Sequence, residues 1–99
     1  MDIKQTILRI SKLRLRSKYS ARELSQMIDK SDNYINRLEN SNFNIPLKTL
    51  YDILEACECS AEEFFYENFE DYKEDKEIIE LLKKVDKNKK QAIISLLKS

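Results

Sequence analysis

The segment from residue 20 to residue 40 constrains the fold most, because it has the pattern of two short helices joined by a tight turn. Ser20 and Glu23 have the spacing of a capping box, in which each side chain binds a backbone N–H at a helix start. A helix is therefore predicted to begin directly after Ser20. Asp29 stands at the turn and tolerates a left-handed backbone, and we expect Ser31 to cap the second helix.

Each of these two helices has an apolar face and a polar face. The apolar positions follow helical spacing and are Leu24, Met27, Ile28, Ile35 and Leu38. Ser25 is small, so the two helices can cross closely. The polar face of the second helix carries side chains that can hydrogen-bond to base edges: Asp32, Asn33, Asn36 and Arg37. The motif predicts a packed helix pair with one polar surface open to a partner.

The region from about residue 6 to residue 65 resembles the Cro/repressor type of helix-turn-helix domain, also called the lambda-repressor-like or XRE family. The resemblance rests on Arg14, Ser20, Glu23, Leu24, Asp29, Ser31, Ile35, Leu38, Glu39, Asn40, Leu47, Thr49, Leu50, Phe64 and Phe65. It implies an all-α fold with a five-helix DNA-binding domain. Two positions differ from the family's usual pattern: Ala21 stands where Gln is frequent and Ser41 where Gly is usual.

The resemblance also assigns roles to individual residues. It implies base reading by Asp32, Asn33, Asn36 and Arg37, and contacts with the DNA backbone by Ser31, Tyr34, Asn40, Asn42 and Arg22. It further implies an ion pair between Arg14 and Glu39 that ties the first helix to the end of the recognition helix. Asp32 can only accept a hydrogen bond, from cytosine N4. Alternatively, Asp32 stabilises the start of the helix, or its presence means that this surface binds no DNA. For Tyr34 there are also two alternatives: it packs on the DNA backbone or it packs between helices.

The net charge of zero hides an asymmetry between the two halves of the chain. Residues 1–50 contain ten Lys and Arg against five Asp and Glu, whereas residues 51–99 contain eight against thirteen. A basic half that contains the helix-turn-helix fits a surface facing phosphates, and an acidic half fits a surface facing away from DNA or towards a protein partner. The simpler interpretation is that these charges only solvate helix surfaces.

The remaining elements of the five-helix domain follow from apolar spacing. A first helix over about 2–17 has the core stripe Ile3, Ile7, Ile10 and Leu13, with a second ridge at Leu8 and Leu15 that needs a cover. A fourth helix after Pro46 presents Leu47, Leu50, Tyr51, Ile53 and Leu54. Ser60 and Glu63 form a second capping box, and we expect Phe64 and Phe65 of that short helix to fill the core, as we do Phe43.

The C-terminal part is predicted to be a second region, so we divide the chain into 1–68 and 69–99. Residues 67–77 have no apolar stripe and are expected to be a linker or a frayed helix. Two amphipathic helices then follow, the second capped by Asp86, as a helical hairpin. We expect it to dimerise through Ile78, Leu82, Ile93, Leu96 and Leu97. The alternative is a monomer whose hairpin covers Leu8 and Leu15.

The sequence thus predicts a cytoplasmic transcriptional regulator, a repressor that binds an inverted-repeat operator on double-stranded DNA as a homodimer. The alternative is a protein-interaction module with the same fold, such as an antitoxin-like or anti-repressor protein. No catalytic residue, cofactor or metal site is predicted, since the chain has no His and no glycine-rich phosphate loop. Cys57 and Cys59 are expected to be reduced thiols, with redox sensing as the alternative. We expect no membrane segment and no secretory signal.

Overall fold

The computed structural model describes residues 1–41 and 43–99. The backbone contact expected of Asn42 therefore lies outside the described residues. The chain forms two compact units, Met1–Tyr66 and Glu67–Ser99, the second beginning two residues before the boundary expected from the sequence. The first unit contains α1 (Ile3–Arg16), α2 (Ala21–Met27), α3 (Tyr34–Ser41), α4 (Leu47–Ala56) and α5 (Ala61–Phe65); the second contains the 3₁₀ helix η1 (Phe69–Asp71), α6 (Tyr72–Leu82) and α7 (Lys87–Lys98). The all-α fold is confirmed.

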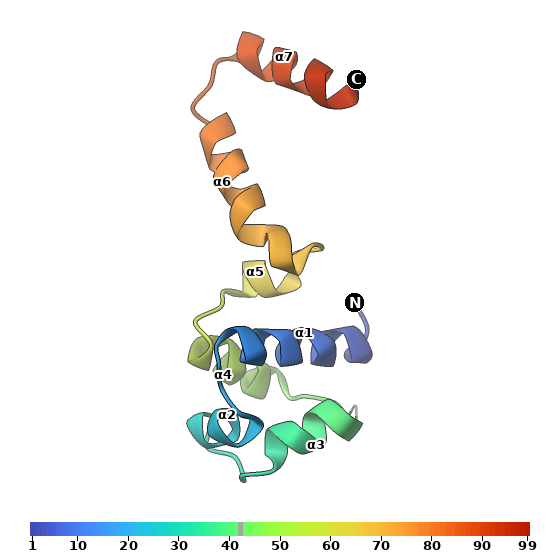
Figure 1. Cartoon of the computed structure of the whole chain (residues 1–99), viewed down its shortest axis with the longest axis vertical. Helices are drawn as coiled ribbons and strands as arrows, with labels where there is room; N and C mark the ends of the chain where they lie inside the picture. Colours follow the sequence, from blue (N-terminus) through green and yellow to red (C-terminus); the bar gives the residue numbers. More distant parts are fainter. Residues whose placement is uncertain (42) are drawn as a thin grey trace. The chain divides into compact units, whose positions relative to one another are not determined.

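The first unit is a helical cluster in which α2 and α3 lie side by side (Figure 1). Helix α1 packs on α3, and α4 packs on α2 and on α5. The fully buried side chains come from every helix of the unit: Ile10, Leu13, Leu24, Ser25, Ile35, Leu38, Ile53 and Phe64. Three residues of the predicted stripe of the first helix, Ile7, Ile10 and Leu13, are buried, and the fourth, Ile3, is half-buried. This core gives the helix-turn-helix a fixed support.

Helices α1, α2 and α5 each begin directly after a residue whose side chain caps the helix. Asp2 and Gln5 form a capping box at α1, and Ser20 and Glu23 form the predicted one at α2. The second predicted box is only half correct. Ser60 accepts from the N–H of Glu63, but the Glu63 carboxylate instead accepts from Arg16 Nη1 at 2.9 Å. The Arg16 guanidinium of α1 binds that carboxylate in place of the Ser60 backbone N–H, because a charge-assisted hydrogen bond is stronger than one from a neutral amide.

Several apolar residues that were expected inside the first unit are exposed. Phe65 is 49% exposed, because the five-residue helix α5 turns only one face inward, and Phe64 takes that place. Leu47 and Tyr51 are exposed because they lie at the edge of the α4 stripe centred on Leu50 and Leu54. Met27 is 47% exposed at the last position of α2. Leu8 and Leu15 are also exposed, so the second ridge of α1 is not covered by the first unit itself.

The segment 67–77 was expected to be a linker or a frayed helix, and the structure favours the helical alternative. The 3₁₀ helix η1 begins at Phe69 and α6 begins at Tyr72. Glu74 and Asp75 lie in the first turn of α6, where negative charge interacts favourably with the helix dipole. The predicted cap of α7 is confirmed, since the Asp86 side chain accepts from the Lys89 N–H at 2.8 Å. No described helix is long and apolar enough to cross a membrane.

Candidate nucleic-acid interface

Helix α2 begins at the reciprocal pair formed by Ser20 and Glu23. The Ser20 hydroxyl accepts from the Glu23 N–H at 3.0 Å, and the Glu23 carboxylate accepts from the Ser20 N–H at 3.0 Å. The hydrogen bond from the Ser20 backbone lowers the pKa of the Glu23 carboxyl. Two of the N–H groups that have no partner within a helix are thereby satisfied, which fixes where α2 starts.

The turn after α2 uses the left-handed residue predicted at this point. Asp29 has φ 59°, and its N–H donates to the Gln26 carbonyl at 3.1 Å. The next N–H, of Lys30, returns to the Ser25 carbonyl at 2.9 Å. These two bonds satisfy carbonyls at the end of α2 and reverse the chain sharply enough for α3 to pack against α2.

Ser25 links the two helices of the motif through its side chain. Its hydroxyl accepts the Ile35 N–H at 3.0 Å and donates to the Ala21 carbonyl at 2.8 Å, and the residue is fully buried. The cap expected from Ser31 is wrong, because the Ser31 hydroxyl instead donates to Asn33 Oδ1 at 3.0 Å. Since α3 begins at Tyr34, Ile35 has one of the N–H groups that lack a helical partner. A residue of α2 thus caps α3.

The far end of α3 is tied to α1 by an ion pair. Arg14 Nε lies 3.1–3.2 Å from both Glu39 carboxylate oxygens, and Arg14 Nη2 lies 2.9 Å from Oε1. Ser11 donates a further hydrogen bond to Oε1 at 2.9 Å, and Arg14 Nη1 donates to the Tyr19 carbonyl. The two charged side chains are only 16% and 12% exposed. Helix α3 is therefore held near both ends.

The outward face of α3 is polar and exposed. Arg37 extends from it and makes no ion pair with any residue that the structure describes. One turn apart, Asn40 Nδ2 donates to the Asn36 carbonyl at 2.7 Å and to Asn36 Oδ1 at 2.9 Å. These bonds use the Asn36 side-chain oxygen as an acceptor and orient its amide. Asn33 lies just before the helix, and its carbonyl accepts the Arg37 N–H.

Asp32 lies in the turn before α3, and two side chains of α2 bind its carboxylate. Arg22 Nη2 lies 3.2 Å from one oxygen, and Gln26 Nε2 donates to the other at 3.1 Å. Both partners in the ion pair are more than half exposed, so this contact contributes little to stability. The contact orients three polar side chains, those of Arg22, Gln26 and Asp32, where α2 lies beside the turn before α3.

Tyr34 and Phe43 form an aromatic pair on the side of α3. Their ring centroids are 5.7 Å apart in an edge-to-face arrangement, and both side chains are half-buried. The Lys30 ammonium lies 5.3 Å from the centroid of the Tyr34 ring, which is cation–π distance. Tyr34 thus packs edge-to-face on Phe43 and stays half-buried, and Phe43 packs at the edge of the core rather than inside it.

Some basic side chains of the first half of the chain bind other groups of the protein. Arg9 donates to the carbonyls of Phe64 and Tyr66, and Arg16 pairs with Glu63. Within residues 20–41, three basic side chains stand against four acidic ones. The motif itself therefore carries no excess of positive charge.

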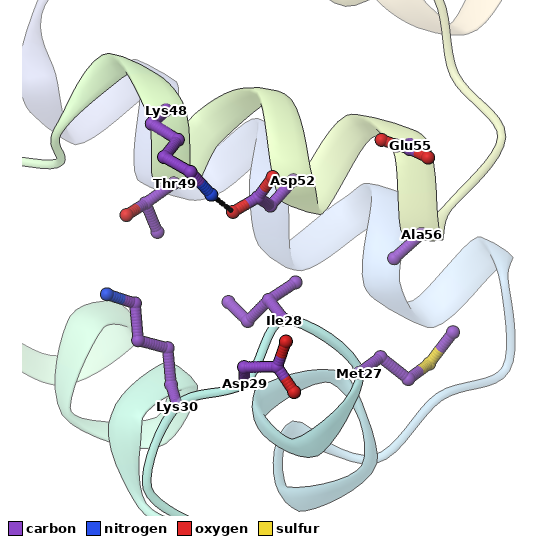
Figure 2. Close-up of a pocket in the computed structure, with 9 residues that line it drawn as sticks. All are labelled: Met27, Ile28, Asp29, Lys30, Lys48, Thr49, Asp52, Glu55 and Ala56. Atoms are coloured by element: carbon purple, nitrogen blue, oxygen red, sulfur yellow. Dashed lines mark hydrogen bonds and ion pairs between the residues drawn. The ribbon is translucent and has the colours of Figure 1, made fainter.

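A polar hollow of about 630 Å³ lies between the turn after α2 and one face of α4 (Figure 2). Its lining residues are Met27, Ile28, Asp29, Lys30, Lys48, Thr49, Asp52, Glu55 and Ala56. Figure 2 shows the Lys48–Asp52 ion pair on α4, at 2.9 Å, facing the turn. No residue expected to touch DNA lines this hollow, so it is separate from the α3 face.

The two thiols lie at the end of α4 and in the connection to α5, and both are buried. Burial raises the pKa of the Cys57 thiol, and it raises the pKa of the Cys59 thiol to about 11. A thiol with a raised pKa is a poor nucleophile at neutral pH. The burial of the two thiols therefore does not favour redox chemistry at Cys57 or Cys59.

Two side chains near the site were not singled out from the sequence. Gln26 joins α2 to Asp32, and Lys30 lies over Tyr34. Both are polar residues in or next to the turn, so their position in the motif was a usable signal. The contact between Gln26 and a residue six positions later required the folded turn.

A short helix, a left-handed turn and a second helix with an exposed polar face define the class of helix-turn-helix proteins. The family model described as "Helix-turn-helix" matches residues 10–64, and the chain belongs to this family, in its Cro/XRE type. The family is one of DNA-binding, non-enzymatic domains, so the chain is a DNA-binding helix-turn-helix regulator. No curated protein and no solved structure matches the chain.

Proposed function

We propose that the chain is a sequence-specific transcriptional regulator that acts in the cytoplasm and represses by occupying an operator. The observation that carries this proposal is the exposed polar face of α3, held near both ends by Ser25 and by the Arg14–Glu39 pair. Because α3 is already held in place, it can enter the major groove without a further loss of backbone freedom on binding. Amide and guanidinium groups on that face match the patterns of base edges.

Asn33, Asn36 and Arg37 are the side chains that read bases in this proposal. Arg37 fits guanine, whose O6 and N7 accept two hydrogen bonds, and the asparagines fit adenine. Asp32 acts through its neighbours, because its carboxylate orients Arg22 and Gln26. Backbone contacts come from Arg22 and from Ser31, Tyr34 and Asn40 at the edges of the same face.

The regulator binds DNA as a dimer in this proposal, on two inverted half-sites. A pair of α3 helices about 34 Å apart would enter successive major grooves. The second unit supports dimerisation, since Ile78, Leu96 and Leu97 are each more than half exposed. Leu82 and Ile93, the other residues proposed for the dimer, are half-buried.

Selection from a random pool of duplex DNA tests the proposal directly. The full chain is incubated with the pool at two salt concentrations, and bound DNA is sequenced while sedimentation reports the mass of the complex. We expect an enriched inverted repeat bound by two chains, with affinity falling as salt rises. A folded protein that enriches no sequence at either salt concentration contradicts sequence-specific binding.

The second candidate is a protein-interaction module. The contact between Arg22 and Asp32 favours it, because a basic residue that would face phosphates is partly neutralised. The acidic second half of the chain would then be the surface for a basic protein partner. A protein that shows no salt-sensitive DNA binding but co-purifies with one basic partner supports this candidate.

A further inference from the structure

Helices α6 and α7 carry the same apolar motif. The sequence Ile-Ile-x-Leu-Leu-Lys occurs at residues 78–83 and again at 93–98, fifteen positions later. The structure leaves both copies uncovered: Ile78, Ile79, Leu81, Ile94, Leu96 and Leu97 are each 42% to 77% exposed. Helix α7 buries none of its residues. Each motif thus forms an apolar helix face that has no cover within its own unit.

The charges that precede the two motifs have opposite signs. Residues 67–77 hold six acidic and two basic side chains, whereas residues 84–92 hold four basic and one acidic. Glu74 stands four positions before Ile78, and Lys89 stands four positions before Ile93. One turn before its apolar face, α6 is therefore acidic and α7 is basic.

These two patterns match only if the helices lie parallel. In that alignment Glu74 faces Lys89, while Ile78 and Leu82 face Ile93 and Leu97. An antiparallel alignment could also bring the apolar turns together, but it would place Glu74 and Lys89 at opposite ends of the contact, where they could not face each other. The connection between α6 and α7 spans only residues 83–86 (Figure 1). So short a connection favours antiparallel neighbours within one chain, so a parallel match needs a second copy.

We propose that α6 of one copy packs in parallel against α7 of a second copy, and that α7 packs in the same way against the partner's α6. A two-fold axis generates both contacts from one, as expected for a homodimer. Apolar turns supply the affinity, and the acidic and basic turns select the register, as flanking charges do in coiled coils. This inference rests on the proposed dimeric function and specifies how the dimer forms.

Charge reversal tests the pairing in the full chain without DNA. One variant combines Glu74→Lys with Glu77→Lys, which makes α6 basic, and the other combines Lys89→Glu with Lys90→Glu, which makes α7 acidic. Each variant alone places like charges together, so we expect its dimer dissociation constant, measured by sedimentation at low salt, to rise roughly tenfold or more. An equimolar mixture restores opposite charges at both contacts and should associate as tightly as the unmodified protein.

Cross-linking tests the parallel direction. A chain with Glu74→Cys is mixed with a chain of different mass that carries Lys89→Cys, and the disulfide-linked heterodimer is quantified. The matched control replaces the second chain by one with Lys98→Cys, which would approach residue 74 only in an antiparallel pair. We expect the first mixture to cross-link and the control to remain largely unlinked.

Three outcomes overturn the inference. Variants that dimerise as well as the unmodified protein indicate pairing of like helices, and stronger linking to residue 98 indicates antiparallel packing. A protein that is monomeric at all concentrations, with intact helical circular dichroism, indicates that the apolar faces are covered within the chain. Selection of an operator by the unmodified protein is scored separately, so sequence-specific binding can stand when this pairing fails.

Discussion

The Ser25 hydroxyl lies 3.0 Å from the backbone nitrogen of Ile35 and accepts its N–H, while it donates to the Ala21 carbonyl of its own helix. One buried side chain of α2 thereby provides the hydrogen-bond acceptor for a backbone N–H in the first turn of α3. The arrangement couples the position of α3 to α2 more directly than a cap on the intervening turn would. The orientation of the proposed base-reading face depends on this contact.

Substitution of Ser25 by Ala should destabilise the protein by about 1 to 3 kcal/mol, because the buried Ile35 N–H loses its acceptor. Urea denaturation followed by circular dichroism measures the change. Ser31→Ala is the matched control, and we expect it to change stability by less than about 0.5 kcal/mol, since that hydroxyl is exposed and its bond within the described part of the chain is to the exposed Asn33. Equal losses for the two variants would contradict a special role of Ser25 in capping α3.

Substitution of Glu39 by Ala should lower the free energy of unfolding by about 3 kcal/mol, because it leaves the Arg14 guanidinium in a largely buried position without its carboxylate. A double-mutant cycle with Arg14→Ala isolates the coupling between the two side chains. The pair of Lys48 and Asp52, in which the lysine is 86% exposed, serves as the control, with an expected loss below about 0.5 kcal/mol for Lys48→Ala. A melting curve of Glu39→Ala that coincides with the unmodified one rules out this structural role.

Substitution of Arg37 by Ala should weaken binding to the selected operator by about 1 to 3 kcal/mol and relax discrimination at one base pair. Binding to random duplex should change far less, because that binding reports phosphate contacts. Lys87→Ala, which removes the same charge from the start of α7, controls for the general electrostatic effect. An equal loss on operator and random DNA would reassign Arg37 to the DNA backbone.

The thiol of Cys59 should make stability decrease in alkaline solution. Burial raises its pKa from 9.0 to about 11, so the folded protein keeps this proton over a range in which the unfolded chain loses it. The contribution is therefore fully present below pH 9 and is lost as the pH rises towards the folded pKa. Urea midpoints at about pH 8 and about pH 10.5 measure the loss, and Cys59→Ala should show a smaller one. An identical pH dependence in both proteins contradicts a buried, protonated thiol.

The sequence by itself determined the helices of the first unit and the position of the turn. Local rules were sufficient there, because a cap such as Ser20 with Glu23 and a left-handed Asp29 act on neighbouring backbone groups. Helical periodicity likewise predicted that Ile10 and Leu13 face the core. At residues 69–77 the same rules left a linker and a frayed helix as alternatives, because the segment has no apolar stripe, and the structure forms η1 and the start of α6 there.

Only the tertiary structure decided which polar groups meet. Ser25 takes the place expected of Ser31, and Glu63 binds Arg16 rather than completing its own cap. Asp32 is engaged by Arg22 and Gln26 of the preceding helix. In each case the three-dimensional packing determines which hydrogen-bond partner is close. Spacing along the chain specifies a helix face, but it does not specify the partner across from that face.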